Sequence, residues 1–150
     1  MAKLYVPLTG SQQSMKTVTK SISLAKVINF EVVVINVIDT ATLNKLNRYK
    51  VFIAEEAEMF GDSMQKDAEK YLNYAAKIGL ENGVKVQTVL LHGDPYPEIM
   101  NFIKNDEESI KIICVSKKSG GELLKDRLSD IERKIILNTP YDVIIFGEDK

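Results

Sequence analysis

The sequence lacks the residues from which several kinds of site and anchor are built. It holds one cysteine, Cys114, and one histidine, His92, so it offers neither an internal disulfide nor a Cys/His metal cluster. No run approaches the roughly 18 apolar residues that predict a membrane-spanning helix. The first residues also lack the long apolar stretch of a signal peptide. We therefore expect a cytoplasmic protein without a membrane partner.

An excess of charge of either sign is missing too. Lysine and arginine number 20, against 21 aspartate and glutamate residues, so no global field would attract nucleic acid. No stretch is polar or repetitive enough to predict disorder. With 150 residues, 45% of them hydrophobic, the chain can build one core, and we expect a single domain over residues 1–150.

What the sequence does contain is an alternation of strand-like and helix-like segments. Strand patterns occur in five short runs, at residues 3–8, 31–38, 84–91, 110–115 and 143–146. Apolar residues recur at three- and four-residue spacing between them, most clearly from Ala57 to Ile78, whereas residues 39–49 show no clear period. This alternation predicts a three-layer α/β sandwich with a doubly wound, five-stranded parallel sheet in the order 3-2-1-4-5.

Local signals define where several helices begin and end. Asn82-Gly83 tolerates the left-handed conformation that ends a helix. We expect Asp94 to cap the next helix, with Pro95 where a missing N–H does no harm. Cys114 lies inside an apolar run, and we interpret it as a small buried hydrophobe.

Three segments, in their order along the chain, resemble the universal stress protein family. Residues 4–11, LYVPLTGS, are similar to the family's V-P-x-D-G-S. Residues 92–99, beginning HGDP and ending in isoleucine, resemble its G-D-P-x-x-x-I, and residues 138–145, NTPYDVII, its H-A-P-C-P-V-L-V. The resemblance covers essentially the whole chain. It implies a Rossmann-like fold of the adenine-nucleotide alpha-hydrolase type and a protein that takes part in a stress response.

The last strand carries the expectation of a dimer. It should lie at one edge of the sheet, and the few residues after it offer no helix to cover that edge. The resemblance implies that family members pair this strand with its twin across a two-fold axis. We therefore expect a homodimer through Asp142, Val143, Ile144, Ile145 and Phe146.

The family's nucleotide-binding signature, G-x-x-G, nine residues and then G-[S/T], meets other residues here. Counted back from the C-terminal motif, its positions fall on Ser116, Ser119, Ser129 and Asp130, and Thr9 stands where nucleotide-binding members usually carry Asp. A serine side chain takes up the space through which a glycine backbone approaches phosphate. We expect weak or absent ATP binding and no cofactor.

Residues 129–132, SDIE, also match a capping box. In that motif the Ser129 side chain accepts the N–H of residue 132, and the Glu132 side chain accepts the N–H of Ser129. The helix would then satisfy its own donors and place two carboxylates where a triphosphate would bind.

Two hypotheses about function follow. The first is a non-catalytic homodimer that acts through contacts with an unknown protein partner; weak nucleotide hydrolysis is left open. The alternative is a module for ATP or another adenine nucleotide. Its base would lie near Val37 and Thr9, and Gly10 belongs to the same pocket. Its phosphates would lie at a modified loop that includes Ser116, Lys117, Ser119, Gly120, Ser129 and Asp130. The lysines and the arginine of this basic loop favour binding of an anion, but acidic residues alternate with them and oppose it. A phosphoreceiver would need an acidic cluster at the strand ends, and Thr9 removes an expected member.

Overall fold

The computed structural model describes residues 1–8, 12–48, 54–118 and 128–147. Its five strands form one parallel sheet in the order β3-β2-β1-β4-β5, which confirms the predicted topology. The strands are β1 (Ala2–Leu8), β2 (Glu31–Asp39), β3 (Val86–Gly93), β4 (Ile110–Ser116) and β5 (Asp142–Phe146).

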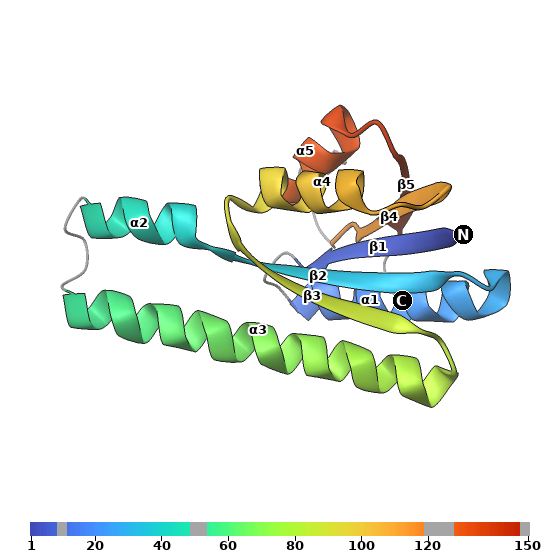
Figure 1. Ribbon diagram of the computed structural model, residues 1–150, viewed down its shortest axis with the longest axis horizontal. Helices are drawn as coiled ribbons and strands as arrows, with labels where there is room; N and C mark the ends of the chain where they lie inside the picture. Colours follow the sequence, from blue (N-terminus) through green and yellow to red (C-terminus); the bar gives the residue numbers. More distant parts are fainter. Residues whose placement is uncertain (9–11, 49–53, 119–127, 148–150) are drawn as a thin grey trace.

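Helices cover both faces of the sheet (Figure 1). On one face α1 (Gln12–Ile28) and α3 (Ala54–Asn82) share a core with β1 and β2, and on the other face α4 (Pro95–Asn105) and α5 (Asp130–Asn138) share a second core. Successive side chains of a strand point to opposite faces. Thus Val34 of β2 lies in the first core and Ile35 in the second, both fully buried. The continuous apolar run of β2 is therefore explained by cores on both sides.

The structure contains one helix that the sequence did not predict, α2 (Thr40–Arg48). Asp39 caps it: one carboxylate oxygen accepts the Thr42 N–H at 2.8 Å, and the other accepts the Thr42 hydroxyl, also at 2.8 Å. In Figure 1, α2 and the start of α3 project beyond the end of the sheet. Residues 39–49 have no apolar repeat of 3.6 residues, and the start of the helix is marked by the Asp39 cap instead. The periodicity of the sequence therefore did not predict this helix.

The predicted helix ends had different outcomes. Gly83 has φ of 68° and follows α3, as expected for a left-handed helix end. The prediction that the Asp94 side chain caps α4 was wrong: Asp94 occupies the N-cap position, but its side chain makes no cap hydrogen bond. A capping side chain accepts the N–H of the second or third helical residue. Because the third residue of α4 is Pro97, only the N–H of the second residue, Tyr96, is available, and the Asp94 side chain makes no hydrogen bond to it.

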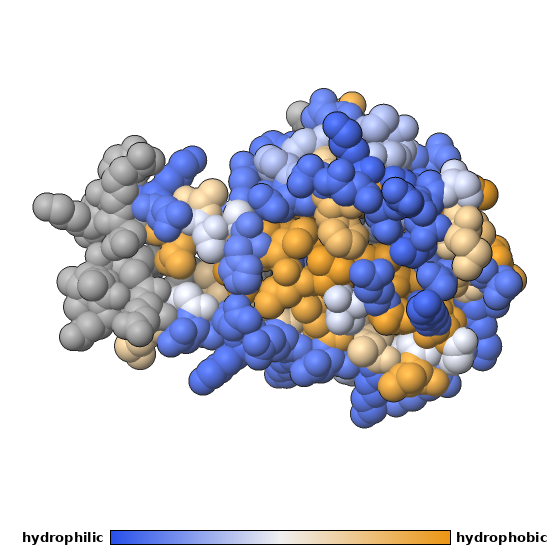
Figure 2. Space-filling model, in the orientation of Figure 1, coloured by the Kyte–Doolittle hydropathy of each residue, from blue (hydrophilic) through white to orange (hydrophobic). Residues whose placement is uncertain are grey.

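The outer edge of β3 forms part of the surface. Figure 2 shows hydrophobic residues gathered over this strand, framed by hydrophilic ones. Val89, Leu90 and Leu91 of β3 are only partly buried. In the described ranges, no helix is long and apolar enough to cross a membrane.

Candidate functional site

A cavity of about 360 Å³ lies over the carboxyl ends of β1 and β2. Its strand side is formed by Leu8, which ends β1, and by residues 36–39 at the end of β2. The volume lies within the range of small-molecule pockets, and ligands of open α/β sheets bind at this edge. The cavity is therefore the candidate functional site.

Helices of both layers complete the walls. Met64, Asp67, Ala68 and Tyr71 come from α3, and their spacing of three and four residues places them on one face of that helix. The remaining walls come from α1, α4 and α5, which contribute Met15, Pro95, Ile99 and Ile131. The cavity thus lies where the two helical layers meet the ends of the strands.

The walls are mainly apolar, with a few polar groups at defined places. Asn36, which is 9% exposed, lies at the end of β2, and Asp39 follows it. Asp67 is exposed on α3. Both charged residues among the described walls are therefore acidic.

The residues predicted to bind a nucleotide fall in three places. Val37 lies in the cavity wall. Ser116 is 1% exposed at the end of β4, where its Oγ accepts a hydrogen bond of 2.6 Å from the Thr17 hydroxyl of α1. The Lys117 N–H donates to the Phe146 carbonyl at 3.1 Å and so continues the pairing of β4 with β5. Thr9, Gly10, Ser119 and Gly120 lie outside the described residues, as does most of the basic loop.

The N-terminus of α5 has the predicted capping box. The Ser129 N–H donates to Glu132 Oε1 at 2.8 Å, and the Glu132 N–H donates to Ser129 Oγ at 3.2 Å. Glu132 is 9% exposed, and Asp130 forms an ion pair with Arg133 of the same helix. Because Ile131 lies in the cavity wall, this helix end lies beside the cavity. Two of its N–H groups are already bonded, and carboxylates stand on both sides of Ile131.

Sequence reasoning missed the polar walls of the cavity. Asp39 was detectable, because it follows the apolar run of β2 at the edge where ligands bind. Asp67 and Tyr71 gave no distinct signal, since they continue the pattern of α3 that also supplies Leu72 and Ala75 to the core. Their role in the wall depends on where α3 crosses the strand ends.

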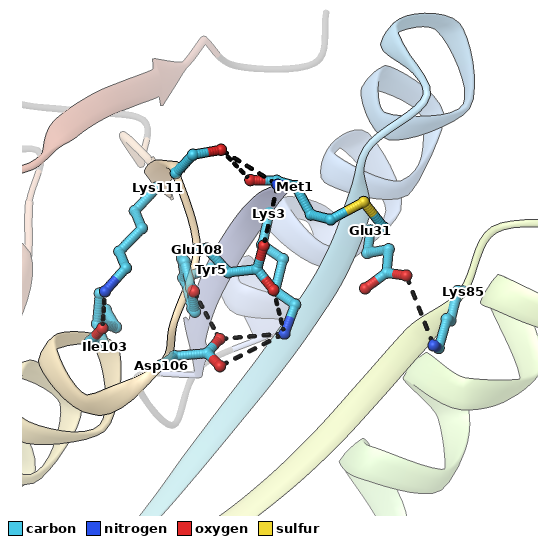
Figure 3. Close-up of polar contacts among 10 residues, drawn as sticks. Met1, Lys3, Tyr5, Glu31, Lys85, Ile103, Asp106, Glu108 and Lys111 are labelled. Atoms are coloured by element: carbon cyan, nitrogen blue, oxygen red, sulfur yellow. Dashed lines mark hydrogen bonds and ion pairs between the residues drawn. The ribbon is translucent and has the colours of Figure 1, made fainter.

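A second polar cluster lies towards the amino ends of the strands and consists of Lys3, Tyr5, Asp106 and Glu108 (Figure 3). Lys3 Nζ lies 3.2 Å from Asp106 Oδ2 and 3.0 Å from Glu108 Oε1, and the Tyr5 hydroxyl donates to Asp106 Oδ2 at 2.6 Å. The cluster connects β1 with the segment between α4 and β4. It was not predicted from the sequence.

The surroundings of the polar cluster and of Cys114 shift the pKa values of their side chains. Burial and the hydrogen bond to Asp106 raise the pKa of Tyr5 far above its usual range. Burial acts to raise the pKa of Asp106, but hydrogen bonds from Tyr5 and Lys3 outweigh it, and the pKa lies below its usual value. Cys114 is fully buried, as predicted, and burial raises its pKa to about 11. Cys114 is therefore a packed thiol and not a nucleophile.

Among the described residues, no group of three or more His, Cys, Asp or Glu residues could hold a metal ion.

Comparison with known proteins gives a consistent result for the whole chain. A sequence model of the universal stress protein family matches residues 1–147. Universal stress protein MJ0531 of Methanocaldococcus jannaschii is 26% identical over 149 residues, which cover 99% of this chain and 83% of that protein. Universal stress protein YxiE of Bacillus subtilis is 25% identical over 149 residues, which cover 95% of this chain and 97% of that protein.

Solved structures share the fold at low sequence identity. The structure of hypothetical protein MJ0577 has a TM-score of 0.74 at 17% identity and covers 99% of this chain and 96% of its own. A universal stress protein in complex with cAMP has a TM-score of 0.63 at 14% identity, with coverage of 97% and 96%. The universal stress protein of Archaeoglobus fulgidus in complex with dAMP has a TM-score of 0.61 at 15% identity, with coverage of 97% of each chain.

Proposed function

This chain belongs to the universal stress protein family, and from that premise we propose that it is a non-catalytic, cytoplasmic stress-response homodimer that acts through contacts with another protein. Its affinity for ATP is weak or absent. The observation that carries the proposal is the closed capping box at the N-terminus of α5, beside the cavity.

The capping box opposes phosphate binding in two ways. A phosphate at a helix N-terminus is held by backbone N–H groups that have no partner within the helix. Here the Glu132 N–H is bonded to Ser129 Oγ, and the Ser129 N–H to the Glu132 carboxylate. The carboxylates of Asp130 and Glu132 also oppose the favourable partial charge of the helix end, so a triphosphate would meet like charge.

The β5 edge supports the homodimer. Within the part of the chain that the structure describes, β5 pairs with β4 alone and is the last strand in the order of the sheet. Its four apolar residues, Val143 to Phe146, are only partly buried. An uncovered edge presents unpaired N–H and C=O groups to solvent, and a two-fold axis would pair it with the same strand of a second copy.

Native mass spectrometry of the purified full chain tests the proposal. We expect the mass of a dimer without a bound nucleotide. A monomer at micromolar concentration would contradict the homodimer, and a nucleotide retained in stoichiometric amount would contradict the loss of phosphate binding.

An adenine-nucleotide module remains a second candidate, favoured by the cavity at the carboxyl edge of β1 and β2, with Val37 in its wall. Complexes of related proteins with cAMP and dAMP support it. Calorimetry with ATP separates the candidates. Micromolar affinity that is lost in Val37→Phe, which narrows the cavity, would favour the nucleotide module.

A further inference from the structure

We propose that the cavity over β1 and β2 binds an organic cation with an apolar body, and that its walls select against anionic ligands. This inference goes beyond the proposed function and does not depend on pairing through β5. It rests on Asp39 and Asp67, the two charged residues among the described walls, which are otherwise largely apolar.

The apolar walls determine the body of the ligand. Leu8, Ile38 and Ile99 provide aliphatic surface from two strands and from α4. Met15 and Met64 face the same space from α1 and α3, and thioether side chains adapt to flat and irregular ligands. A cavity of about 360 Å³ is large enough for a body the size of an indole ring.

The carboxylates determine the charge. Asp67 has no ion-pair partner in the part of the chain that the structure describes, although it lines the cavity. Asp39 uses one lone pair on each oxygen for Thr42 and retains further acceptor capacity. Tyr71 adds an aromatic ring to the α3 wall, and a cation over such a ring is stabilised further. An amine on an apolar body would therefore find complementary charge on these described walls, whereas the two carboxylates would repel a phosphate or a carboxylate.

A bare metal ion fits this cavity poorly. Ca²⁺ and Mg²⁺ require six or more oxygen ligands, and the described residues contain no cluster of three or more acidic or metal-binding side chains. Most of the described wall consists of carbon and sulfur. An organic cation uses both the apolar surface and the carboxylates.

Three probes with the same ring and similar size separate the effect of charge from that of shape. They are tryptamine, which is a cation, 3-ethylindole, which is neutral, and indole-3-propionate, which is an anion. The protein contains no tryptophan, so indole fluorescence excited beyond the absorption of tyrosine comes from the probe alone. We expect tryptamine to bind about tenfold more tightly than indole-3-propionate, with 3-ethylindole between them, because partly exposed carboxylates contribute modestly.

Variants locate the binding site. Asp67→Asn keeps the shape of the side chain and should narrow the difference between tryptamine and indole-3-propionate by about threefold. Glu81→Gln removes the same charge from an exposed position of α3 that does not line the cavity, and it should leave the difference unchanged. Ala68→Leu fills the cavity and should weaken all three probes.

Several results would overturn the inference. One is binding of indole-3-propionate at least as tight as that of tryptamine. Another is no binding of any probe at about 1 mM. Binding of tryptamine that neither Asp67→Asn nor Ala68→Leu changes would place the cation elsewhere. If Ala68→Leu does not fold, the comparison of Asp67→Asn with Glu81→Gln decides alone.

Discussion

The Tyr5 hydroxyl of the central strand β1 donates a hydrogen bond of 2.6 Å to Asp106 Oδ2, in the segment that follows α4. The same carboxylate oxygen lies 3.2 Å from Lys3 Nζ. Two residues of one strand face thus hold one carboxylate 101 positions away from Tyr5. The contact fixes the end of α4 against β1, and its contribution to stability can be measured.

Tyr5→Phe should lower the free energy of unfolding by about 1 to 2 kcal/mol. The substitution leaves the ring in place but removes the donor to a partly buried carboxylate. Urea unfolding followed by circular dichroism gives the value. Tyr74→Phe makes the same chemical change at a residue that is 51% exposed, and it should change stability by less than about 0.5 kcal/mol. Equal effects of the two substitutions would show that the Tyr5 hydroxyl contributes nothing specific.

The Asp106 carboxylate should make stability depend on acid pH. Its pKa in the folded protein lies below the ordinary 3.8, so the folded state binds the proton less readily than the unfolded chain does. The stabilisation is therefore present above the ordinary pKa and is lost as pH falls through the lowered one. Asp106→Asn should be less stable at neutral pH and should show a shallower loss between neutral and acid pH. Thermal unfolding at a series of pH values measures this, and parallel curves for the two proteins would contradict it.

Restoring the family's residues around the phosphate position should raise ATP affinity. The variant combines Ser116→Gly, Ser129→Gly and Asp130→Ser with two changes outside the described residues, Thr9→Asp and Ser119→Gly. Removing the Ser129 cap frees the Glu132 N–H for a phosphate, and Asp130→Ser removes a charge. Calorimetry with ATP provides the comparison with the wild type. Unchanged affinity in a variant that folds well would mean that another feature closes the site.

Substitution in β5 should weaken the homodimer. Ile145→Lys places a charge on the strand that we propose to pair across the two-fold axis, so the dimer should dissociate at higher protein concentration in light scattering. Thr88→Lys is the matched control, because it adds the same side chain to β3, the opposite edge of the sheet. A dimer that tolerates Ile145→Lys but not Thr88→Lys would move the interface to the apolar β3 edge. Far-UV circular dichroism of both variants checks that the fold is retained.

The fold could be predicted from the sequence further than the site could. Strand patterns and their alternation with helices define the order of the sheet, because right-handed crossovers leave few other topologies. The capping box of α5 was also predictable, since both of its hydrogen bonds join residues three positions apart. Interactions between residues this close in the chain can be recognised from a short stretch of sequence.

The cavity walls and the cluster at the amino ends depend on distant contacts. Lys3 and Asp106 carry no mutual signal in the sequence. Neither do Asp39 and Asp67, which line the same cavity only because α3 crosses the ends of the strands. Asp94 shows that a local rule can also fail, because it occupies the N-cap position without a side-chain cap hydrogen bond. Pro97 removes one of the two N–H groups that a capping side chain can bind.

The central position of β1 in the sheet has a consequence for folding during synthesis on the ribosome. β1 pairs with β2 on one side and with β4 on the other, where Ala2 lies opposite Ile110. At typical rates of translation, β4 emerges roughly 5 to 20 seconds after β1. During that interval one edge of the strand that becomes the middle of the sheet has no partner, and it could pair with another nascent chain. The half formed by β1, β2 and β3 therefore exists for this interval with the β4 side of β1 unpaired.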